Sequence, residues 1–569
     1  MLAGIVSAAN SKISSDLATL DPTSTVDVIV QYQTAPNVAA HAKAKGKGGA
    51  LKRELKSIRA ALYSLPVSQL SSMAADTNVT YISRDRRLAA TLDFASYAAG
   101  ADLAHRAGWT GAGVGVAVID SGVSGHWDLH HTPLGSTRLG ATKVVYSESF
   151  LGVATQAPAS KNDEYGHGTH VAGIVAGTGW SSTGGQFTKT IRGIAPEAHI
   201  IDLKVLDAQG AGTDAAVIAA IERAVELKAR YNIRVINLSL GRPVLESYVS
   251  DPLGKAVEAA WQAGIVVVVA AGNAGRDNSL GNEGYGTINS PANHPLVITV
   301  GAMKTLGTLT KGDDLIASYS AKGPTAVDHI AKPDLVAPGN KIASLSFNDL
   351  SSLAKAAPEN AVPYSYYRAS GQTSVASGVY LWLSGTSMAA PMVSGAAAMM
   401  LQKDPSLTPD LVKARLMKTA SKQFPAFSTA TDPVTGQLYR SQYDLFTVGA
   451  GHLDVHAALQ NTDFTAKSAA SPTALYDAAS RRVRLVKAAN ALWGENALWG
   501  DNAIWGDRLA KGENALWGDN ALWGDNALWG DSTSRAFNAL WGDNALWGDT
   551  ALWGEAVRAS NSAMLKGEK

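Results

Sequence analysis

Apolar runs recur along the middle of the chain and alternate with amphipathic stretches. The runs are apolar at nearly every position, which is typical of strands covered on both faces of a sheet. One stretch between them, 213–230, carries Val217, Ile221 and Val225 at helical spacing. Buried strands that alternate with helices predict an α/β fold with a doubly wound, mostly parallel sheet over residues 98–460. The predicted strands are 114–120, 199–206, 234–240, 265–273 and 296–302.

Residues 1–97 predict a small α+β unit in front of this region. Residues 26–32 alternate apolar and polar side chains, as a half-buried strand does, and 79–83 predicts a second strand. Between them, leucines and an isoleucine recur at helical spacing from Leu51 to Leu62 and predict an amphipathic helix.

The composition changes after residue 460. Residues 461–489 form a polar, Ala/Ser-rich stretch that we interpret as a linker, and a tail of 556–569 ends the sequence. Between them, 490–555 consists of eleven hexads close to NALWGD, nine of which contain tryptophan and ten of which end in Asp or Glu.

The hexad period itself carries a structural prediction. An even period places every tryptophan on one face of an extended chain, and Gly-Asp-Asn is a turn signal. The repeat therefore predicts a β-solenoid, and the alternative is a disordered low-complexity tail. Acidic groups in register are candidate calcium ligands, and the partner of the repeat is unknown from sequence.

Composition and charge exclude several classes of protein. The 569 residues include no cysteine, so disulfides, thiolate metal sites and thiol catalysis are excluded. A net charge of +1 gives no electrostatic case for a nucleic-acid partner or an anionic membrane surface. No apolar run reaches the roughly 18 residues of a membrane span. No signal peptide is visible at the start of the sequence.

Four polar residues stand at ends of the predicted strands and helices. Asp120 and Asn273 each end a buried strand, while His167 follows Gly166 and Ser387 follows Gly385-Thr386, each near the start of a helix. Each residue has an ordinary structural interpretation, since Asp and Ser cap helices and Asn tolerates turns with positive φ. Pro391 follows Ser387 closely and is expected in the first turn of its helix.

The pair His167 and His170 raises a metal hypothesis. Zinc helices of hydrolases usually space their histidines four apart with a glutamate between, whereas here the gap is three and a third ligand is not evident. We therefore predict no metal ligands and expect His170 to pack in the core. A zinc hydrolase that uses both histidines is the alternative.

Together the motifs VIDSGV, GHGTHVAG, AAGN and GTSMAAP, in this order, resemble those of the subtilisin-like serine proteases, the subtilases. The resemblance extends over about residues 98–460. It implies a serine endopeptidase of broad specificity that works through an acyl-enzyme and needs no catalytic cofactor. Ser387 would be the nucleophile, His167 the general base and Asp120 the residue that orients the imidazole. The Asn273 side chain and the backbone N–H of Ser387 would form the oxyanion hole.

The resemblance also implies a substrate pocket for an apolar P1 side chain. Asn289 falls at the pocket base, where many relatives have glycine. The two predicted walls are Ser239, Leu240 and Gly241 on one side and Ala270, Ala271 and Gly272 on the other.

By the same resemblance, residues 1–97 would be a propeptide that inhibits the enzyme and is removed by it between about Arg84 and Tyr97. The basic stretch 84–93 is expected to be exposed to proteolysis. The implied partners are protein or peptide substrates and the chain's own propeptide, and the implied location is extracellular. A rival hypothesis is a binding or surface-structural protein in which the tryptophan repeat has the main role.

Two segments depart from the family pattern. The loop 177–193 contains no carboxylate where relatives often bind calcium, so structural calcium is not supported by this sequence. The insert 348–378 precedes the nucleophile and is expected to shape the rim of the cleft.

Overall fold

The computed structural model describes most of the chain up to residue 486 and a short segment near its end. The described residues are 12–486 and 564–568, apart from 15–16, 18–19, 86, 91–98, 132–139, 153–161, 280, 309–310, 348–349, 369–375, 426, 433–435, 465–467 and 478–481.

The α/β region contains a central sheet of eight strands. The strand order is β14-β13-β12-β10-β6-β8-β7, with β15 also paired to β13. Every pairing is parallel except that of β14 with β13, which confirms the predicted mostly parallel sheet and its five predicted strands. The bounds are β6 Gly115–Asp120, β7 Val144–Ser149, β8 His199–Lys204, β10 Ile233–Leu238, β12 Val266–Ala270, β13 Ile298–Lys304, β14 Leu315–Ile316 and β15 Leu335–Pro338.

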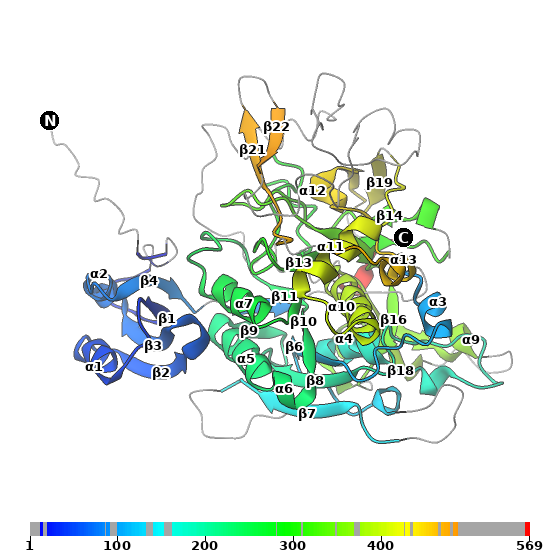
Figure 1. The fold of residues 1–569 in the computed structure, drawn as a ribbon, viewed down its shortest axis with the longest axis horizontal. Coiled ribbons are helices and arrows are strands. Elements are labelled where there is room, and N and C mark those ends of the chain that lie inside the picture. The colour runs from blue at the N-terminus through cyan, green and yellow to red at the C-terminus, as the bar shows by residue number, and fades with distance from the viewer. Residues whose placement is uncertain are drawn as a thin grey trace.

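Two pairs of helices cover the two faces of this sheet (Figure 1). Helices α4 (His167–Ala176) and α10 (Thr386–Lys403) pack against each other on one face. Helices α5 (Asp214–Glu226) and α7 (Pro252–Gln262) pack against each other on the opposite face. Helix α5 confirms most of the helix predicted over 213–230, and its apolar stripe enters the core.

The N-terminal unit forms a lobe beside α5 and α7 (Figure 1). Its antiparallel sheet has the order β2-β3-β1-β4 and packs with helices α1 and α2. Both predicted strands of this unit are confirmed, as β1 and β4. The bounds are β1 Thr25–Tyr32, α1 Val38–Gly46, β2 Ala50–Leu55, β3 Ala60–Pro66, α2 Leu70–Ala74 and β4 Val79–Arg84.

The helix predicted from Leu51 to Leu62 is wrong, because this stretch forms β2, a short 3₁₀ turn and β3. Antiparallel pairing of β2 with β3 and of β3 with β1 satisfies the backbone that a helix would have satisfied internally. Leu55, Ile58 and Leu62 still converge, and they join the core cluster of the α/β region. Tertiary burial therefore explains their apolar character without a helix.

Polar contacts also join the N-terminal unit to the rest of the chain. The backbone N–H and Oγ of Ser57 both donate to Oε1 of Glu222 on α5, at 2.7 Å each. The Ala215 N–H donates to Oδ1 of Asp85 at 2.7 Å, at the start of the same helix. This lobe is therefore docked by apolar and polar contacts together.

Part of the predicted linker 461–489 is instead folded onto the α/β region. Strands β21 (Thr473–Asp477) and β22 (Arg482–Val486) form a hairpin. The Ala331 N–H donates to the Pro472 carbonyl at 2.8 Å, and Ala474 is fully buried. A polar composition rich in small residues was misleading here because buried alanines pack closely without long apolar side chains.

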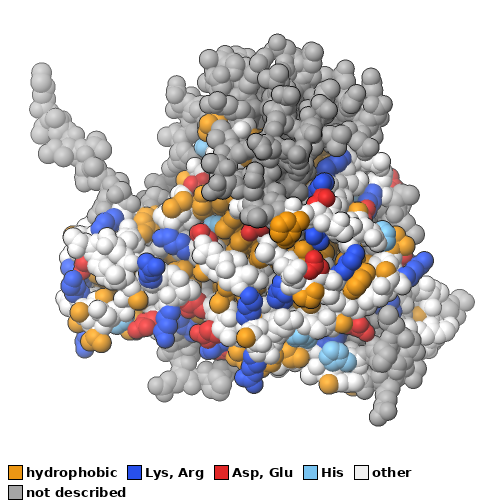
Figure 2. Space-filling view, in the orientation of Figure 1, with side chains coloured by type: hydrophobic (Ala, Val, Ile, Leu, Met, Phe, Trp, Pro, Cys, Tyr) orange, Lys and Arg blue, Asp and Glu red, His pale blue; other side chains and the backbone are white. Residues whose placement is uncertain are grey.

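The hexad repeat 490–555 lies outside the described residues. Within the described part of the chain, no helix has the length and apolarity that a membrane span requires. Positive and negative side chains are interspersed over the described surface of the face in Figure 2, in keeping with the net charge of +1.

Candidate active site

Three neighbouring strands bring the predicted site residues to one edge of the sheet. Strands β6, β10 and β12 are adjacent, and Asp120, Ser239 and Asn273 stand at or just after their carboxyl ends. From β6 the chain first builds β7 and β8 on one side, and then β10 and β12 on the other. The residues therefore meet at a topological switch point, where doubly wound sheets place their sites.

Asp120 and His167 form a buried pair. The His167 ring nitrogen Nδ1 lies 2.5 Å from Oδ1 of Asp120, and both side chains are at most 1% exposed. A Cβ on Gly168 would lie 2.2 Å from the carbonyl oxygen of Gly122, so only glycine lets α4 approach the end of β6 this closely. The predicted proximity of the two side chains is thus present.

A second carboxylate, Asp163, holds the start of α4, and the sequence analysis missed it. Its oxygens accept hydrogen bonds from the N–H groups of Gly166 and Thr169, at 2.7 Å each, and from Oγ of Ser121 at 2.7 Å. Burial raises the pKa of Asp163, while the bonds from Thr169 and Ser121 oppose that rise. Its position four residues before His167 was the available signal, because acidic residues cap helix starts.

The first turns of α10 hold Ser387 against the end of β10. Ser387 is the second residue of α10, and Gly385 before it has φ +154°, a region that favours glycine. The Oγ of Ser387 donates to the Ser239 carbonyl oxygen at 3.0 Å. In return, Oγ of Ser239 donates to the Ser387 carbonyl oxygen at 2.6 Å.

Pro391 explains why the Ser387 carbonyl oxygen accepts a hydrogen bond from the Ser239 hydroxyl. The expectation that it lies in the first turn is wrong, since α10 begins at Thr386 and Pro391 is its sixth residue. Proline lacks the N–H that would bond the carbonyl four residues earlier, and that carbonyl belongs to Ser387. The Ser239 hydroxyl supplies the missing donor and ties the predicted nucleophile to the predicted pocket wall.

Asn273 presents a donor with no partner in the described part of the chain. Its Oδ1 accepts from the N–H and the Oγ1 of Thr386, at 2.9 and 3.0 Å. These bonds fix the amide orientation and leave Nδ2 buried without a hydrogen bond to any described residue. An oriented, unpaired donor next to Ser387 can bind an oxyanion.

His170 faces the core and not the site. It is fully buried on α4, and its Nε2 lies 3.0 Å from the Leu381 carbonyl oxygen. Burial lowers the pKa of His170 to about 3, so the ring is neutral at physiological pH. Its contacts are those of a packed residue, as predicted, and they turn its Nε2 away from any ligand shared with His167.

The predicted pocket walls face each other across Asn289. A Cβ on Gly241 would lie 3.0 Å from the Asn289 Cβ, and a Cβ on Gly272 would lie 2.9 Å from its Nδ2. The Asn289 N–H also donates to the Ala271 carbonyl oxygen at 3.0 Å. The side chain of Asn289 is thus held between the two predicted walls, so the base of the predicted pocket carries a polar group.

A strand of the N-terminal segment lies at this pocket. Strand β5 (Arg87–Ala90) pairs antiparallel with β9 (Ala211–Thr213) on one side and with β11 (Leu240–Gly241) on the other. Its last residue, Ala90, is the register partner of Leu240 in the predicted wall. The expectation of an exposed stretch at 84–93 is therefore wrong for the backbone of β5, which is paired on both edges.

The loop 177–193, where relatives often bind calcium, does not fit a calcium ion in this chain. The loop 177–193 has no carboxylate, and Asp128 beside it is engaged by protein donors. Its Oδ1 accepts from the Ser181 N–H at 2.8 Å and its Oδ2 from the Tyr380 hydroxyl at 2.7 Å. Across the described ranges no group of three or more His, Asp or Glu side chains is arranged to hold a metal.

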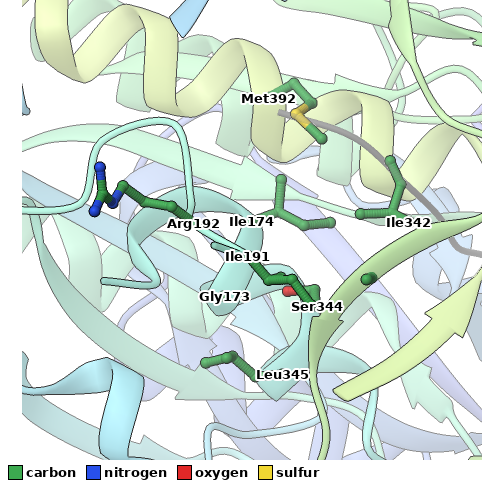
Figure 3. A pocket seen from close by; sticks show the side chains of 9 residues that line it. Gly173, Ile174, Ile191, Arg192, Ile342, Ser344, Leu345 and Met392 are labelled. Atoms are coloured by element: carbon green, nitrogen blue, oxygen red, sulfur yellow. The ribbon is translucent and has the colours of Figure 1, made fainter. Parts of the chain in front are cut away.

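A separate cavity lies under α4 and contains none of the predicted catalytic residues (Figure 3). Six of its nine lining residues have apolar side chains, and the guanidinium of Arg192 points away from the other labelled side chains. We regard it as a packing defect between α4, α10 and β16 (Ile342–Leu345). The lining residues are Gly173, Ile174, Ile191, Arg192, Ile342, Ala343, Ser344, Leu345 and Met392.

The fold and site together define an α/β protein with a buried Asp–His pair and a serine-bearing helix at the switch point of its sheet. Residues 111–451 match the model of the Subtilase family. The chain belongs to this family.

Two curated relatives and one solved structure agree with this assignment. The chain is 37% identical over 403 residues to serine protease AprX of Bacillus subtilis, covering 69% of this chain and 80% of the relative. It is 31% identical over 404 residues to subtilisin E of Bacillus subtilis, covering 69% of this chain and 84% of the relative. The structure of fervidolysin from Fervidobacterium pennivorans matches with a TM-score of 0.54 at 22% identity, over 80% of this chain and 63% of fervidolysin. As a member of the Subtilase family with these relatives, the chain is a serine endopeptidase.

Proposed function

We propose that the chain hydrolyses peptide bonds with Ser387 as nucleophile, His167 as general base and Asp120 as the residue that orients the imidazole. The observation that carries this proposal is the 2.5 Å contact between Nδ1 of His167 and Oδ1 of Asp120. It fixes the tautomer with the proton on Nδ1, so that Nε2 can accept the proton of a serine hydroxyl. An acyl-enzyme on Oγ of Ser387 then forms, the leaving amine takes the proton from His167, and water completes the cycle.

Charge on the tetrahedral intermediate requires donors that are already oriented. The amide Nδ2 of Asn273 and the backbone N–H of Ser387 are proposed for this role. The support is the pair of bonds from Thr386 to Oδ1 of Asn273, because they leave the amide nitrogen as the end that faces outward from α10.

The proposed P1 preference is apolar, with a polar contact at the base of the pocket. The support is the composition of the two walls, Leu240–Gly241 and Ala270–Gly272, which carry no charged side chain. Asn289 between them favours a P1 residue that reaches the base with a hydrogen-bonding group, such as tyrosine, over one that is purely aliphatic. The test is kcat/KM on matched peptides with Tyr, Phe or Leu at P1, and the Tyr peptide should be cleaved fastest.

We further propose that residues 1–97 are a propeptide that inhibits the enzyme and is removed by it. The support is the antiparallel register of β5 with both β9 and β11, which is how an extended substrate adds to strand edges. An extracellular location and the action on protein or peptide substrates belong to the same proposal, with no catalytic cofactor. For the repeat 490–555, the β-solenoid and the disordered tail both stay predictions from sequence, and no partner is assigned to it.

The direct test is hydrolysis of casein by the purified chain, with Ser387→Ala as the matched control. The proposal expects loss of hydrolysis in the variant, inhibition of the parent by serine-directed reagents and no inhibition of the chemical step by chelators. N-terminal sequencing of the parent and of Ser387→Ala reports processing. Chelator-sensitive hydrolysis that survives in Ser387→Ala would instead support the zinc alternative.

A further inference from the structure

Residues 564–568, near the end of the sequence, lie inside the catalytic unit although the chain before them carries the repeat. Met564, Leu565 and Lys566 form one helical turn, and Met564 and Glu568 are each only 2% exposed. Figure 1 places this segment, in red, within the body of the catalytic unit. We call it the terminal segment.

The carboxylate of Glu568 is held in a buried cationic pocket. Its Oε1 accepts from Nη2 of Arg276 at 2.7 Å and from the Ser318 N–H at 2.9 Å, and the Ser318 hydroxyl also bonds to it. Its Oε2 pairs with Nζ of Lys304 at 2.9 Å. Although burial alone would raise the pKa of Glu568, Lys304, Ser318 and Arg276 together lower it, so the group is ionised.

This pocket needs the acidic residue. The Lys304 side chain is 5% exposed, and Glu568 is its single ion-pair partner among the described residues. Arg276 has one other carboxylate, Asp432, at 2.6 Å. An ammonium group buried this deeply is costly unless it is paired, so the pocket is built to bind a carboxylate.

Backbone contacts fix the segment in one register. The Glu568 N–H donates to Oδ1 of Asn340 at 2.9 Å, and Nδ2 of Asn340 donates to the Glu568 carbonyl oxygen at 3.1 Å. Nδ2 of Asn360, from the insert 348–378, donates to the Leu565 carbonyl oxygen at 2.7 Å. The insert that departs from the family pattern therefore contributes directly to holding the segment.

The other end of the segment reaches the catalytic pair. The Ser384 N–H, three residues before Ser387, donates to the Met564 carbonyl oxygen at 2.9 Å. The Tyr165 hydroxyl lies 3.7 Å from the Met564 sulfur, and the Tyr165 ring stacks on that of His167 at a centroid distance of 6.2 Å. Met564 thus lies against residues that adjoin both the predicted nucleophile and the predicted base.

Strand β5 approaches the same centre from another direction. It pairs with β11, on the Ser239 side of Ser387, whereas Met564 bonds to the backbone at Ser384. The terminal segment and β5 therefore contact different backbone positions around Ser387.

We propose that the terminal segment is a second intramolecular inhibitor, which binds the leaving-group side of the cleft and is recognised by the Arg276–Lys304 pocket through Glu568. This proposal rests on the peptidase function proposed above. Release of the segment opens that side of the cleft to long substrates, independently of the N-terminal unit.

Hydrogen exchange of the full chain tests the docking without any need for activity. In a Ser387→Ala background, residues 564–568 are expected to be protected, and Glu568→Gln should raise their exchange rate about tenfold or more, since a charged hydrogen bond is lost. The matched control is Lys566→Gln, because Lys566 is exposed and should leave the protection unchanged. Exchange at the rate of a free peptide in the unmodified segment would overturn the docking.

Kinetics of the active chain test the inhibition. Glu568→Gln should raise kcat/KM about tenfold, mainly through KM, on peptides that extend several residues past the cleaved bond. The same variant should change little on a substrate with a small chromogenic leaving group, and Lys566→Gln should change neither rate. A released segment with unchanged kcat/KM on extended peptides would overturn the proposal. Absence of hydrolysis in every protein, with the segment still protected, would refute the peptidase function and leave the docking standing.

Discussion

Two buried clusters of charge in this molecule differ in how completely their polar atoms are paired. In the lysine cluster, Asp334 accepts at Oδ2 from Lys332 at 2.7 Å and from the Thr299 N–H at 2.8 Å. Its Oδ1 accepts from Ser471 at 2.6 Å and pairs with Lys413 at 3.0 Å. Although burial alone would raise the pKa of Asp334, the two lysines hold it below its usual range.

The catalytic cluster is paired less completely. Oδ2 of Asp120 and Nδ2 of Asn273 are buried without a hydrogen-bond partner in the described part of the chain. Buried polar groups are nearly always satisfied, and each exception requires an explanation. In this pair of clusters the structural one is fully paired, whereas the proposed catalytic one keeps an oriented donor, Nδ2 of Asn273, where the charge of the intermediate is proposed to develop.

The largest expected effect comes from breaking the lysine cluster. Asp334→Asn leaves two buried lysines beside a neutral amide, and we expect a loss of about 3–5 kcal/mol in the free energy of unfolding. Denaturant titration of a Ser387→Ala background avoids self-digestion during the measurement. The exposed pair of Lys418 and Asp463 offers the control, since Asp463→Asn should cost about 0.5 kcal/mol or less. Equal losses in the two variants would remove the distinction.

Substitution in the proposed catalytic cluster should lower kcat and leave the stability of the fold unchanged. Asn273→Asp keeps an oxygen acceptor for Thr386 but replaces the donor amide with a negative charge, so we expect kcat to fall by about 10²–10³-fold. Steady-state kinetics and a denaturation midpoint for the same preparation separate the two effects. Unchanged kcat, or a loss that follows unfolding, would exclude Nδ2 of Asn273 from the oxyanion hole.

The two hydrogen bonds between Ser239 and Ser387 are a fully paired contact inside the proposed catalytic region. They therefore test whether full pairing there contributes to stability, as it does in the lysine cluster. Ser239→Ala leaves the Ser387 carbonyl buried without its donor and should lower stability by about 1–3 kcal/mol. Pro391→Ala restores the helical N–H, so Ser239→Ala should cost clearly less in that background. Denaturation of both single variants and the double variant measures the coupling; strictly additive losses would contradict our account of Pro391.

The smallest expected effect concerns pH. Burial, together with the nearby charge of Asp214, raises the pKa of Asp85 from 3.8 to about 7, so the docked N-terminal unit holds a proton that the free unit would lose. Docking is therefore strongest below about pH 4 and weakens as the pH rises toward 7. The measurement is the melting temperature of the Ser387→Ala chain with and without Asp85→Asn. As the pH rises over this range, the melting temperature of the chain that carries Asp85→Asn should increasingly exceed that of the chain that keeps Asp85. A gap independent of pH would contradict the burial of an ionisable Asp85.

The sequence was sufficient to predict an element where its local pattern is compatible with a single secondary structure. Continuous apolar runs predicted the five central strands, and the resemblance placed His167 beside Asp120, where the structure has a 2.5 Å contact. It failed where distant contacts decide: Leu55, Ile58 and Leu62 join the core of the α/β region from two strands and a turn, and Ala474 is buried although its segment has a polar composition. The partnership of Pro391 with Ser239 could not be predicted either, because it joins residues far apart in the chain through a missing N–H.

The measurement that tests the central claim most directly is a double-mutant comparison of kcat/KM for Ser387→Ala, His167→Ala and the variant with both changes. If the two side chains act as one unit, each single variant and the double variant should fall to the same residual rate, roughly a millionfold below the parent. Losses that multiply in the double variant, or substantial activity in either single variant, would contradict the account.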